Sequence, residues 1–298
     1  MRRALLPLAA VLGLLVAAAP VLAGEPADPR VVAGTPHGFI PSHGNASGHA
    51  RPGGGGGSDP TLHYNGGPVM TGGTVVQPIF WGSSWSNASF AGDKVTGLAS
   101  FYGGVGGSHY LQTNAEYTDS STQHVSTAVT ARSAVTDTTA APSKAPSTST
   151  ILNEVAHKFP NPTPNAYYPV YVDTKRGHAG YCAWHSSGTI NGIQVQFGFF
   201  FNLDGDSGCD PGSSASYSQG LAALANVSGH ELSEMITDPQ LNAWYDQSGA
   251  ENADKCAWLF NGMSTFGGKS WLIQGNWSNA AYAAGTGYDS LKGCLASA

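Results

Sequence analysis

The chain has 298 residues, of which only 11% are charged, and its formal net charge is −6 at neutral pH. Beyond the first residues it contains no cluster of lysine and arginine. This argues against a nucleic-acid partner, because binding to phosphates needs a basic patch.

Residues 1–23 have the organisation of a signal peptide. Arg2 and Arg3 form a short basic start, residues 4–19 are apolar and uncharged, and small residues suit cleavage after Ala23. The apolar run is short for a membrane-spanning helix. We therefore expect a secreted, extracellular protein that has no membrane contact once the leader is removed.

The next segment, residues 24–60, is expected to be a disordered linker or a propeptide. Its stretch GNASGHARPGGGGGSDP has little to bury and no periodicity, so it cannot repay its ordering entropy. Its histidines, His37, His43 and His49, are interpreted as solvated, with metal scavenging as the weaker alternative. Residues 61–298 are long enough for one domain with a substantial core.

Three strands are expected, because β-branched and aromatic residues are concentrated there and glycines flank two of them. They cover residues 74–81, 165–174 and 192–203. Pro169 lies inside the second and lacks a backbone N–H, which suggests a sheet edge or a bulge.

Three helices are expected. The first covers residues 92–102 and is stopped by the pair Gly103-Gly104. The second covers residues 147–159, and the third covers residues 217–236, with an apolar stripe near the 3.6-residue period. Pro239 ends the third helix. Strands and helices followed by irregular structure predict a single α+β domain with a mixed sheet.

Four cysteines, an even number in an exported chain, predict two disulfides with three possible pairings. We predict nearest-neighbour pairing, Cys182 with Cys209 and Cys256 with Cys294. A metal site made of the four thiolates is the alternative, and the absence of any C-x-x-C pair argues against it.

The third helix carries the run SGHELSEMITDP, in which His230, Glu231 and Glu234 read H-E-x-x-E. A zinc-peptidase helix reads H-E-x-x-H, so a carboxylate replaces the second imidazole. His230 and Glu234 are four residues apart on one helix face and can reach the same ion. Glu231 lies about 100° around the helix, where it can act as general base on a water without binding the metal.

Further ligands must come from outside this helix, and GAENADKC is the best source. We expect Glu251 as the third ligand, with Asp254 as a fourth ligand or a partner that orients the others. His185, in CAWHSS, is a reserve candidate. Zinc is expected first, and because this donor set is rich in carboxylates, manganese and calcium are the alternatives. A buried polar network without metal is the competing interpretation.

The run SGHELSEMITDPQLNAWYD, followed by ENADKCAW, resembles the core signature of the phosphate-induced protein family, also called the Exordium family. Those proteins carry H-E-[LI]-x-E-x-x-T-[DN]-P-x-x-N-A-W-Y and then E-x-x-D-x-C. LHYNGGPVMTGGTVVQPIFWGSSW is similar to their opening H-x-G-G-P region, and YCAWHSSG resembles their C-G-F-H segment. The resemblance covers most of residues 61–298, although residues 110–150 show no clear correspondence. It implies an extracellular protein associated with growth at the cell wall.

Two function classes therefore stay open. The first is a metal-dependent, metallopeptidase-like hydrolase acting on a peptide or a cell-wall polymer. The second is a non-enzymatic extracellular protein that binds the cell wall or signals growth. A serine hydrolase built on Ser207 in GDSGC has little support, because the rest of that motif is missing.

Overall fold

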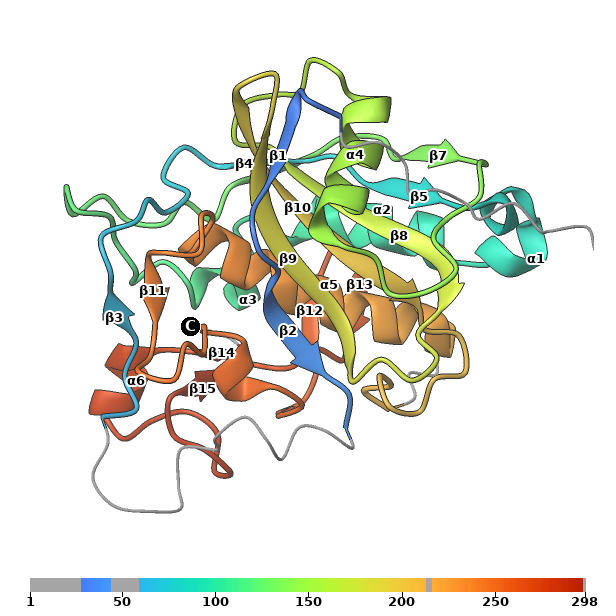
Figure 1. Cartoon of the computed structure of the whole chain (residues 1–298). Helices are drawn as coiled ribbons and strands as arrows, with labels where there is room; N and C mark the ends of the chain where they lie inside the picture. The colour runs from blue at the N-terminus through green and yellow to red at the C-terminus, as the bar shows by residue number, and fades with distance from the viewer. Residues whose placement is uncertain (1–27, 44–58, 213–215, 297–298) are drawn as a thin grey trace, which may run out of the picture.

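The computed structural model describes residues 28–43, 59–212 and 216–296. A mixed sheet carries helices on both faces (Figure 1), so the expected α+β class is confirmed. The signal peptide expected at residues 1–23 lies outside the described residues. Among the helices that are described, none has the length and apolarity to cross a membrane.

Within the described residues the main sheet has nine strands, which lie on both sides of the long strand β8. β8 pairs in parallel with β10 on one side and with β4 and β5 on the other, while β9 is antiparallel to β10. The strands are β1 (Val31–Ala33), β2 (His37–Pro41), β4 (Thr74–Val76), β5 (Ile79–Trp81), β6 (Val129–Ala131), β7 (Val135–Asp137), β8 (Tyr167–Lys175), β9 (Tyr181–Ile190) and β10 (Ile193–Asn202).

The expected edge position of the strand that contains Pro169 is wrong. β8 lies inside the sheet, and the expected strand over residues 74–81 is split into β4 and β5 by Gln77 and Pro78. Tyr167 pairs with the end of β4 and Val170 with the start of β5, so Pro169 lies opposite the break between them. No ladder hydrogen bond is required there, which is why an interior strand tolerates a proline.

Six helices and two 3-10 turns accompany the sheet within the described ranges. In Figure 1, α5 and α2 lie behind the sheet and α4 lies in front of it. The helices are α1 (Ala88–Ala91), α2 (Lys94–Val105), α3 (His109–Gln112), α4 (Thr148–Lys158), α5 (Gln219–Thr237) and α6 (Asn279–Ala283), and the 3-10 turns are η2 (Ser83–Ser86) and η3 (Asp254–Cys256).

The predicted stop of α2 at Gly103-Gly104 is wrong, because the helix continues to Val105. A Cβ atom on Gly104 would lie 2.2 Å from the Cα of Gly267. The glycine therefore serves close contact with a hairpin of the C-terminal part, β12 (Ser264–Phe266) and β13 (Lys269–Trp271). Tertiary packing has overridden a local stop signal.

The C-terminal part is mostly irregular, as expected, and is held by short strand pairs. Three of these are β11 with β3, β12 with β13, and β14 with β15. The strands not yet given are β3 (His63–Tyr64), β11 (Trp244–Tyr245), β14 (Asn276–Trp277) and β15 (Cys294–Leu295). Both disulfides have the predicted pairing, Cys182–Cys209 and Cys256–Cys294. Two disulfides are typical of a chain that folds in an oxidising compartment.

The expectation that residues 24–60 are unstructured is wrong for residues 28–43. β1 and β2 pair antiparallel with the outer edge of β9. Ile40 is fully buried in the core, and neither His37 nor His43 is free in solvent: His37 contacts Glu251, and the ring of His43 packs on Trp258. The polar composition of this segment gives no sign of strands, because its pairing partners lie about 150 residues away along the chain, as the pair His37–His185 shows.

Candidate metal centre

Helix α5 brings a histidine and two glutamates into the protein interior. It begins at the Ser218 cap, whose side chain accepts from Leu221 N–H, and ends before Pro239. Every residue from Gly220 to Thr237 is buried, so the helix is central rather than amphipathic. The side chains of His230, Glu231 and Glu234 are fully buried as a result.

A loop anchored by a disulfide brings two further carboxylates against this helix. Glu251 is fully buried, and Asp254 begins η3, which ends at the disulfide-bonded Cys256. The backbone N–H of Asp254 donates to Glu234 Oε1 at 2.8 Å. The backbone N–H of Glu251 donates to Asp254 Oδ2 at 3.2 Å. The loop is therefore hydrogen-bonded directly to the helix residue it faces.

His230, Glu234 and Asp254 form one group that could hold a metal ion, because one donor atom of each lies within 4.8 Å of the others. His230 Nε2 lies 3.2 Å from Glu234 Oε1 and 3.6 Å from Asp254 Oδ1. Around a tetrahedral zinc, bonds of about 2.0–2.1 Å place neighbouring ligand atoms about 3.3 Å apart. The three donors therefore have separations that suit one small divalent cation.

A second group shares Glu234 and contains His185 and Glu231. His185 lies on β9, where it faces α5, and its Nε2 is 3.7 Å from Glu234 Oε2 and 3.1 Å from Glu251 Oε2. Glu251, expected as the third ligand beside His230, contacts this second histidine instead. We call the whole set the α5 cluster; its members are His185, His230, Glu231, Glu234, Glu251 and Asp254.

Several atoms of the α5 cluster are buried and have no hydrogen-bond partner in the described part of the chain. They are His230 Nε2, both carboxylate oxygens of Glu231, Glu234 Oε2, Glu251 Oε1 and His185 Nδ1. Leaving buried polar atoms unpaired is costly, and native proteins rarely do so. A cation among these atoms would satisfy several at once, so the residues fit a metal.

The electrostatics of the α5 cluster point the same way. Burial raises the pKa of Glu231, Glu234 and Asp254 well above the ordinary carboxyl range, and neighbouring carboxylates raise it further. Burial also opposes ionisation of Glu251, but His185 and His37 hold the pKa of this group at about 2. Burial lowers the pKa of His230. Protein groups alone therefore do not balance the full negative charge of the cluster.

Sequence reasoning missed two residues that contact the α5 cluster. His37, at the start of β2, places Nδ1 3.4 Å from Glu251 Oε2. Gln274 places its amide nitrogen 2.9 Å from His230 Nδ1 and also donates to the Ala253 carbonyl at 2.8 Å. Both lie in stretches without any metal-site motif, so only the fold could reveal them.

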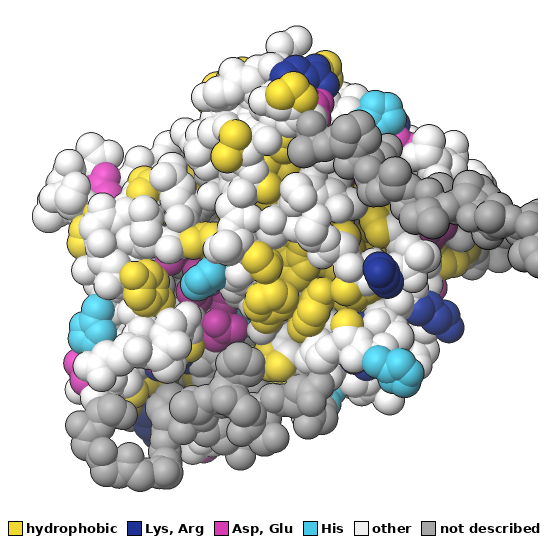
Figure 2. Space-filling model, in the orientation of Figure 1, with side chains coloured by type: hydrophobic (Ala, Val, Ile, Leu, Met, Phe, Trp, Pro, Cys, Tyr) yellow, Lys and Arg dark blue, Asp and Glu magenta, His cyan; other side chains and the backbone are white. Residues whose placement is uncertain are grey.

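Access to the α5 cluster is narrow. The exposed fraction of the side chain is 36% for His37 and 14% for Asp254, whereas it is 0% for His230 and Glu234. Figure 2 shows acidic and histidine side chains gathered between β11 and β2, beside an apolar surface. The centre is thus buried just beneath one face of the molecule.

Comparisons of the chain with protein-family models, with curated proteins and with solved structures return no match. The resemblance to the Exordium family therefore stays a prediction drawn from sequence motifs.

Proposed function

We propose that this protein is a secreted metal-dependent hydrolase, with zinc the first candidate cation and peptides the first candidate substrates. One observation carries the proposal: donor atoms of the buried His230 and Glu234, on the helix that reads H-E-x-x-E, lie close to each other and to a carboxylate oxygen of the partly exposed Asp254. When bound, a divalent cation supplies Lewis-acid chemistry, which polarises a carbonyl and makes water more acidic.

Glu231 is the proposed general base and acid. Both of its carboxylate oxygens are buried without a hydrogen-bond partner among the described residues, and burial raises its pKa well above the ordinary value. A carboxylate whose pKa is raised is a stronger base, so it can take a proton from water and return it to a leaving group. Donor atoms of Glu231, Glu234 and His185 lie within 4.8 Å of one another, so the proposed base lies beside the ligand Glu234.

The choice of cation follows from the donor atoms. Two imidazoles, His230 and His185, share Glu234. Imidazole nitrogen donors favour zinc, whereas the carboxylate oxygens of the cluster also suit manganese, and calcium prefers oxygen ligands alone. Export through the expected signal peptide agrees with the two disulfides, which need an oxidising compartment.

A non-enzymatic extracellular protein, which would bind the cell wall or signal growth, is the second candidate. The contact between His230 and Gln274 favours it. If the Gln274 amide donates to Nδ1, the proton of the neutral ring sits on Nε2, the atom that faces Glu234. The α5 cluster would then be a polar network that joins helix α5 to the η3 loop.

Metal content of the mature protein, measured by plasma mass spectrometry, separates the two candidates. We expect about one equivalent of zinc or manganese in the wild type and a loss of at least tenfold in the double variant His230→Gln, Glu234→Gln. The exposed His109 provides a control, since His109→Gln should leave the metal content unchanged. Wild-type protein that holds no metal after addition of zinc and removal of the excess would overturn the proposed function.

A further inference from the structure

Strand β2 lies along the edge of β9 that is nearest the α5 cluster. It pairs antiparallel with β9, with His37 opposite His185, Ile40 opposite Ala183 and Pro41 opposite Tyr181, and the register shifts between each of these pairs. β1 continues along the same edge, from Val31 opposite Ile190 to Ala33 opposite Gly188. One continuous segment of this chain therefore covers the outer edge of a ten-residue strand.

Gly38 brings the backbone of this segment into direct contact with the α5 cluster. Its φ is 56°, a left-handed value that favours glycine. A Cβ atom there would lie 2.1 Å from Glu234 Oε2 and 2.3 Å from the ring of His185. A peptide backbone fits against the two cluster residues at this point, and a side chain does not.

The residues that flank Gly38 also make specific contacts along the edge of β9. His37 reaches Glu251, and this contact raises the pKa of the His37 imidazole. Ile40 is fully buried in the core. Phe39 packs edge-on against Tyr181, with ring centroids 4.9 Å apart. The edge thus provides a position for glycine and, two residues later, a buried apolar position.

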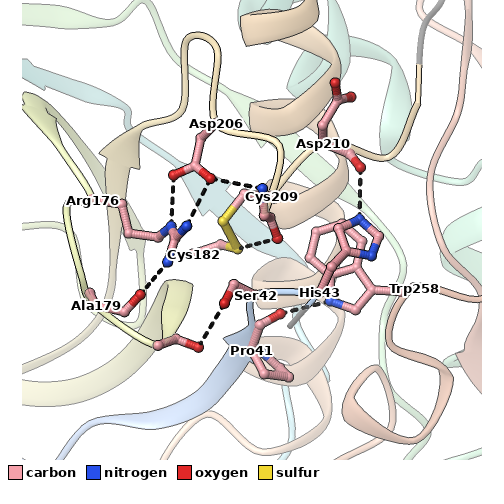
Figure 3. The surroundings of a disulfide bond; sticks show 12 residues. Pro41, Ser42, His43, Arg176, Ala179, Cys182, Asp206, Cys209, Asp210 and Trp258 are labelled. Atoms are coloured by element: carbon pink, nitrogen blue, oxygen red, sulfur yellow. Dashed lines mark hydrogen bonds and ion pairs between the residues drawn. A yellow bond between two sulfur atoms is a disulfide. The ribbon is translucent and has the colours of Figure 1, made fainter. Parts of the chain in front are cut away.

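The end of β2 is held beside the first disulfide (Figure 3). Trp258 Nε1 donates to the Pro41 carbonyl at 2.7 Å, and the backbone N–H of His43 donates to the Gly208 carbonyl at 2.8 Å. The ring centroids of His43 and Trp258 lie 4.0 Å apart, and His43 Nε2 donates to the Asp210 carbonyl. These contacts use backbone groups and one aromatic face, as the binding of an extended peptide does.

Without residues 31–41, β9 would be an edge strand with a row of unpaired N–H and C=O groups beside the α5 cluster. Such an edge is a template for adding an extended peptide as a further strand. We propose that the outer edge of β9 is a binding site for extended polypeptide, and that residues 31–41 occupy it as a built-in pseudosubstrate. The ligand carries glycine at the position of Gly38 and a branched aliphatic residue two positions later. The expectation that a peptide bound at this edge is hydrolysed rests on the proposed function.

The first test uses the full chain with a protease recognition sequence inserted between His43 and Asp59. After cleavage, the N-terminal fragment should stay bound to the remainder during size-exclusion chromatography. A fluorescent peptide of residues 28–43 should exchange into the cut wild-type protein. The same peptide with Gly38→Ala should bind at least about tenfold more weakly, because its Cβ meets Glu234 and His185. In this test the protein that binds the peptide carries no substitution, so a folding defect of a variant cannot imitate the result.

A second test introduces Gly38→Ala into the cut full chain, with Gly177→Ala as the matched control. Gly177 has a similar φ of 60°, and nothing lies within 4 Å of a Cβ there. We expect release of the fragment in Gly38→Ala and retention in Gly177→Ala. Equal exchange of the wild-type and Gly38→Ala peptides, or no exchange of either, would overturn the inference and make β2 an ordinary structural strand.

A third measurement keeps the inference apart from the proposed function. Fragment release should speed the hydrolysis of a peptide that contains Gly-x-Ile by at least about tenfold, with the metal content unchanged. Glycine-dependent exchange without any hydrolysis supports the peptide-binding edge and overturns the hydrolase. Hydrolysis that occurs without exchange or release supports the hydrolase and overturns the pseudosubstrate.

Discussion

The imidazole of His230 is hydrogen-bonded to the side-chain amide of Gln274, with His230 Nδ1 and Gln274 Nε2 2.9 Å apart. The same amide nitrogen donates to the Ala253 carbonyl, and Gln274 Oε1 accepts the backbone N–H of Trp258. This orientation makes Nδ1 an acceptor, so the neutral ring carries its proton on Nε2. A metal ligand needs Nε2 free, usually with Nδ1–H donating to an oxygen.

The tautomer of His230 should therefore report metal binding directly. In metal-free protein we expect the Nε2–H form, and after addition of zinc the Nδ1–H form, with the Gln274 amide turned to present its oxygen. The ¹⁵N NMR shifts of the two ring nitrogens distinguish these states. A ring that keeps its Nε2 proton in excess zinc would favour the interpretation of the α5 cluster as a polar network without metal.

Glu231→Gln should separate binding from chemistry. The amide keeps the volume of the side chain but cannot take a proton from water, so we expect peptide turnover to fall by about 10²- to 10⁴-fold. Metal content should stay within about twofold, because Glu231 is not a proposed ligand. Turnover and metal content are measured on the same preparation, and unchanged turnover would remove Glu231 from its role.

The two disulfides should differ in their effect on the centre. Cys256–Cys294 anchors the loop that carries Glu251 and Asp254, whereas Cys182–Cys209 lies beside the end of β2 (Figure 3). Replacing either pair with serine should cost about 2–4 kcal/mol of folding stability. Only the 256–294 variant should also lose about tenfold or more in zinc affinity, measured by competition with a chelator. Equal zinc affinities in the two variants would contradict the role of Cys256–Cys294 in positioning Glu251 and Asp254.

Asp206 should contribute stability that depends on pH. It makes two hydrogen bonds to Arg176, at 2.7 and 2.8 Å, and these lower the pKa of its carboxyl group. Because the folded-state pKa is depressed, the stabilisation is fully present above the unfolded value of about 3.9 and is lost as pH falls through the folded value.

We therefore expect Asp206→Asn to lower the free energy of unfolding at pH 7 by about 1 kcal/mol, a value reduced for partial exposure to solvent. The difference from wild type should shrink below about pH 4 in denaturant titrations. Asp289 is fully exposed, and its pair with Lys292 should contribute almost nothing, so Asp289→Asn is the control. A difference that grows in acid would contradict the assignment.

Two adjacent glycines in α2 should respond in opposite directions to alanine. Nothing lies within 4 Å of a Cβ on Gly103, so Gly103→Ala should raise stability by about 0.5–1 kcal/mol. Gly104→Ala should lower stability, because its Cβ would meet the backbone of Gly267 at 2.2 Å. Thermal unfolding of the two variants tests the packing of α2 on the β12–β13 hairpin.

Features that depend on neighbours in sequence could be predicted. The span of α5, the i and i+4 spacing of His230 and Glu234, helix α4 and the long strand β10 all follow from local periodicity and capping, and the structure has each of them. Disulfide pairing was also predictable, because short loops between cysteines favour neighbours in sequence.

Features that depend on distant partners were decided only by the tertiary structure. Pro169 lies inside the sheet because β4 and β5 break opposite it, and His37 meets Glu251 only because β2 pairs with β9. His185 was a reserve candidate from the sequence, and only the packing of β9 against α5 brings it to Glu234. Periodicity is a property of consecutive residues, whereas the pairing of β2 with β9 joins segments about 150 residues apart, and burial decides among such pairings. The sequence by itself therefore determined the helix that holds the centre, and packing determined what surrounds and covers it.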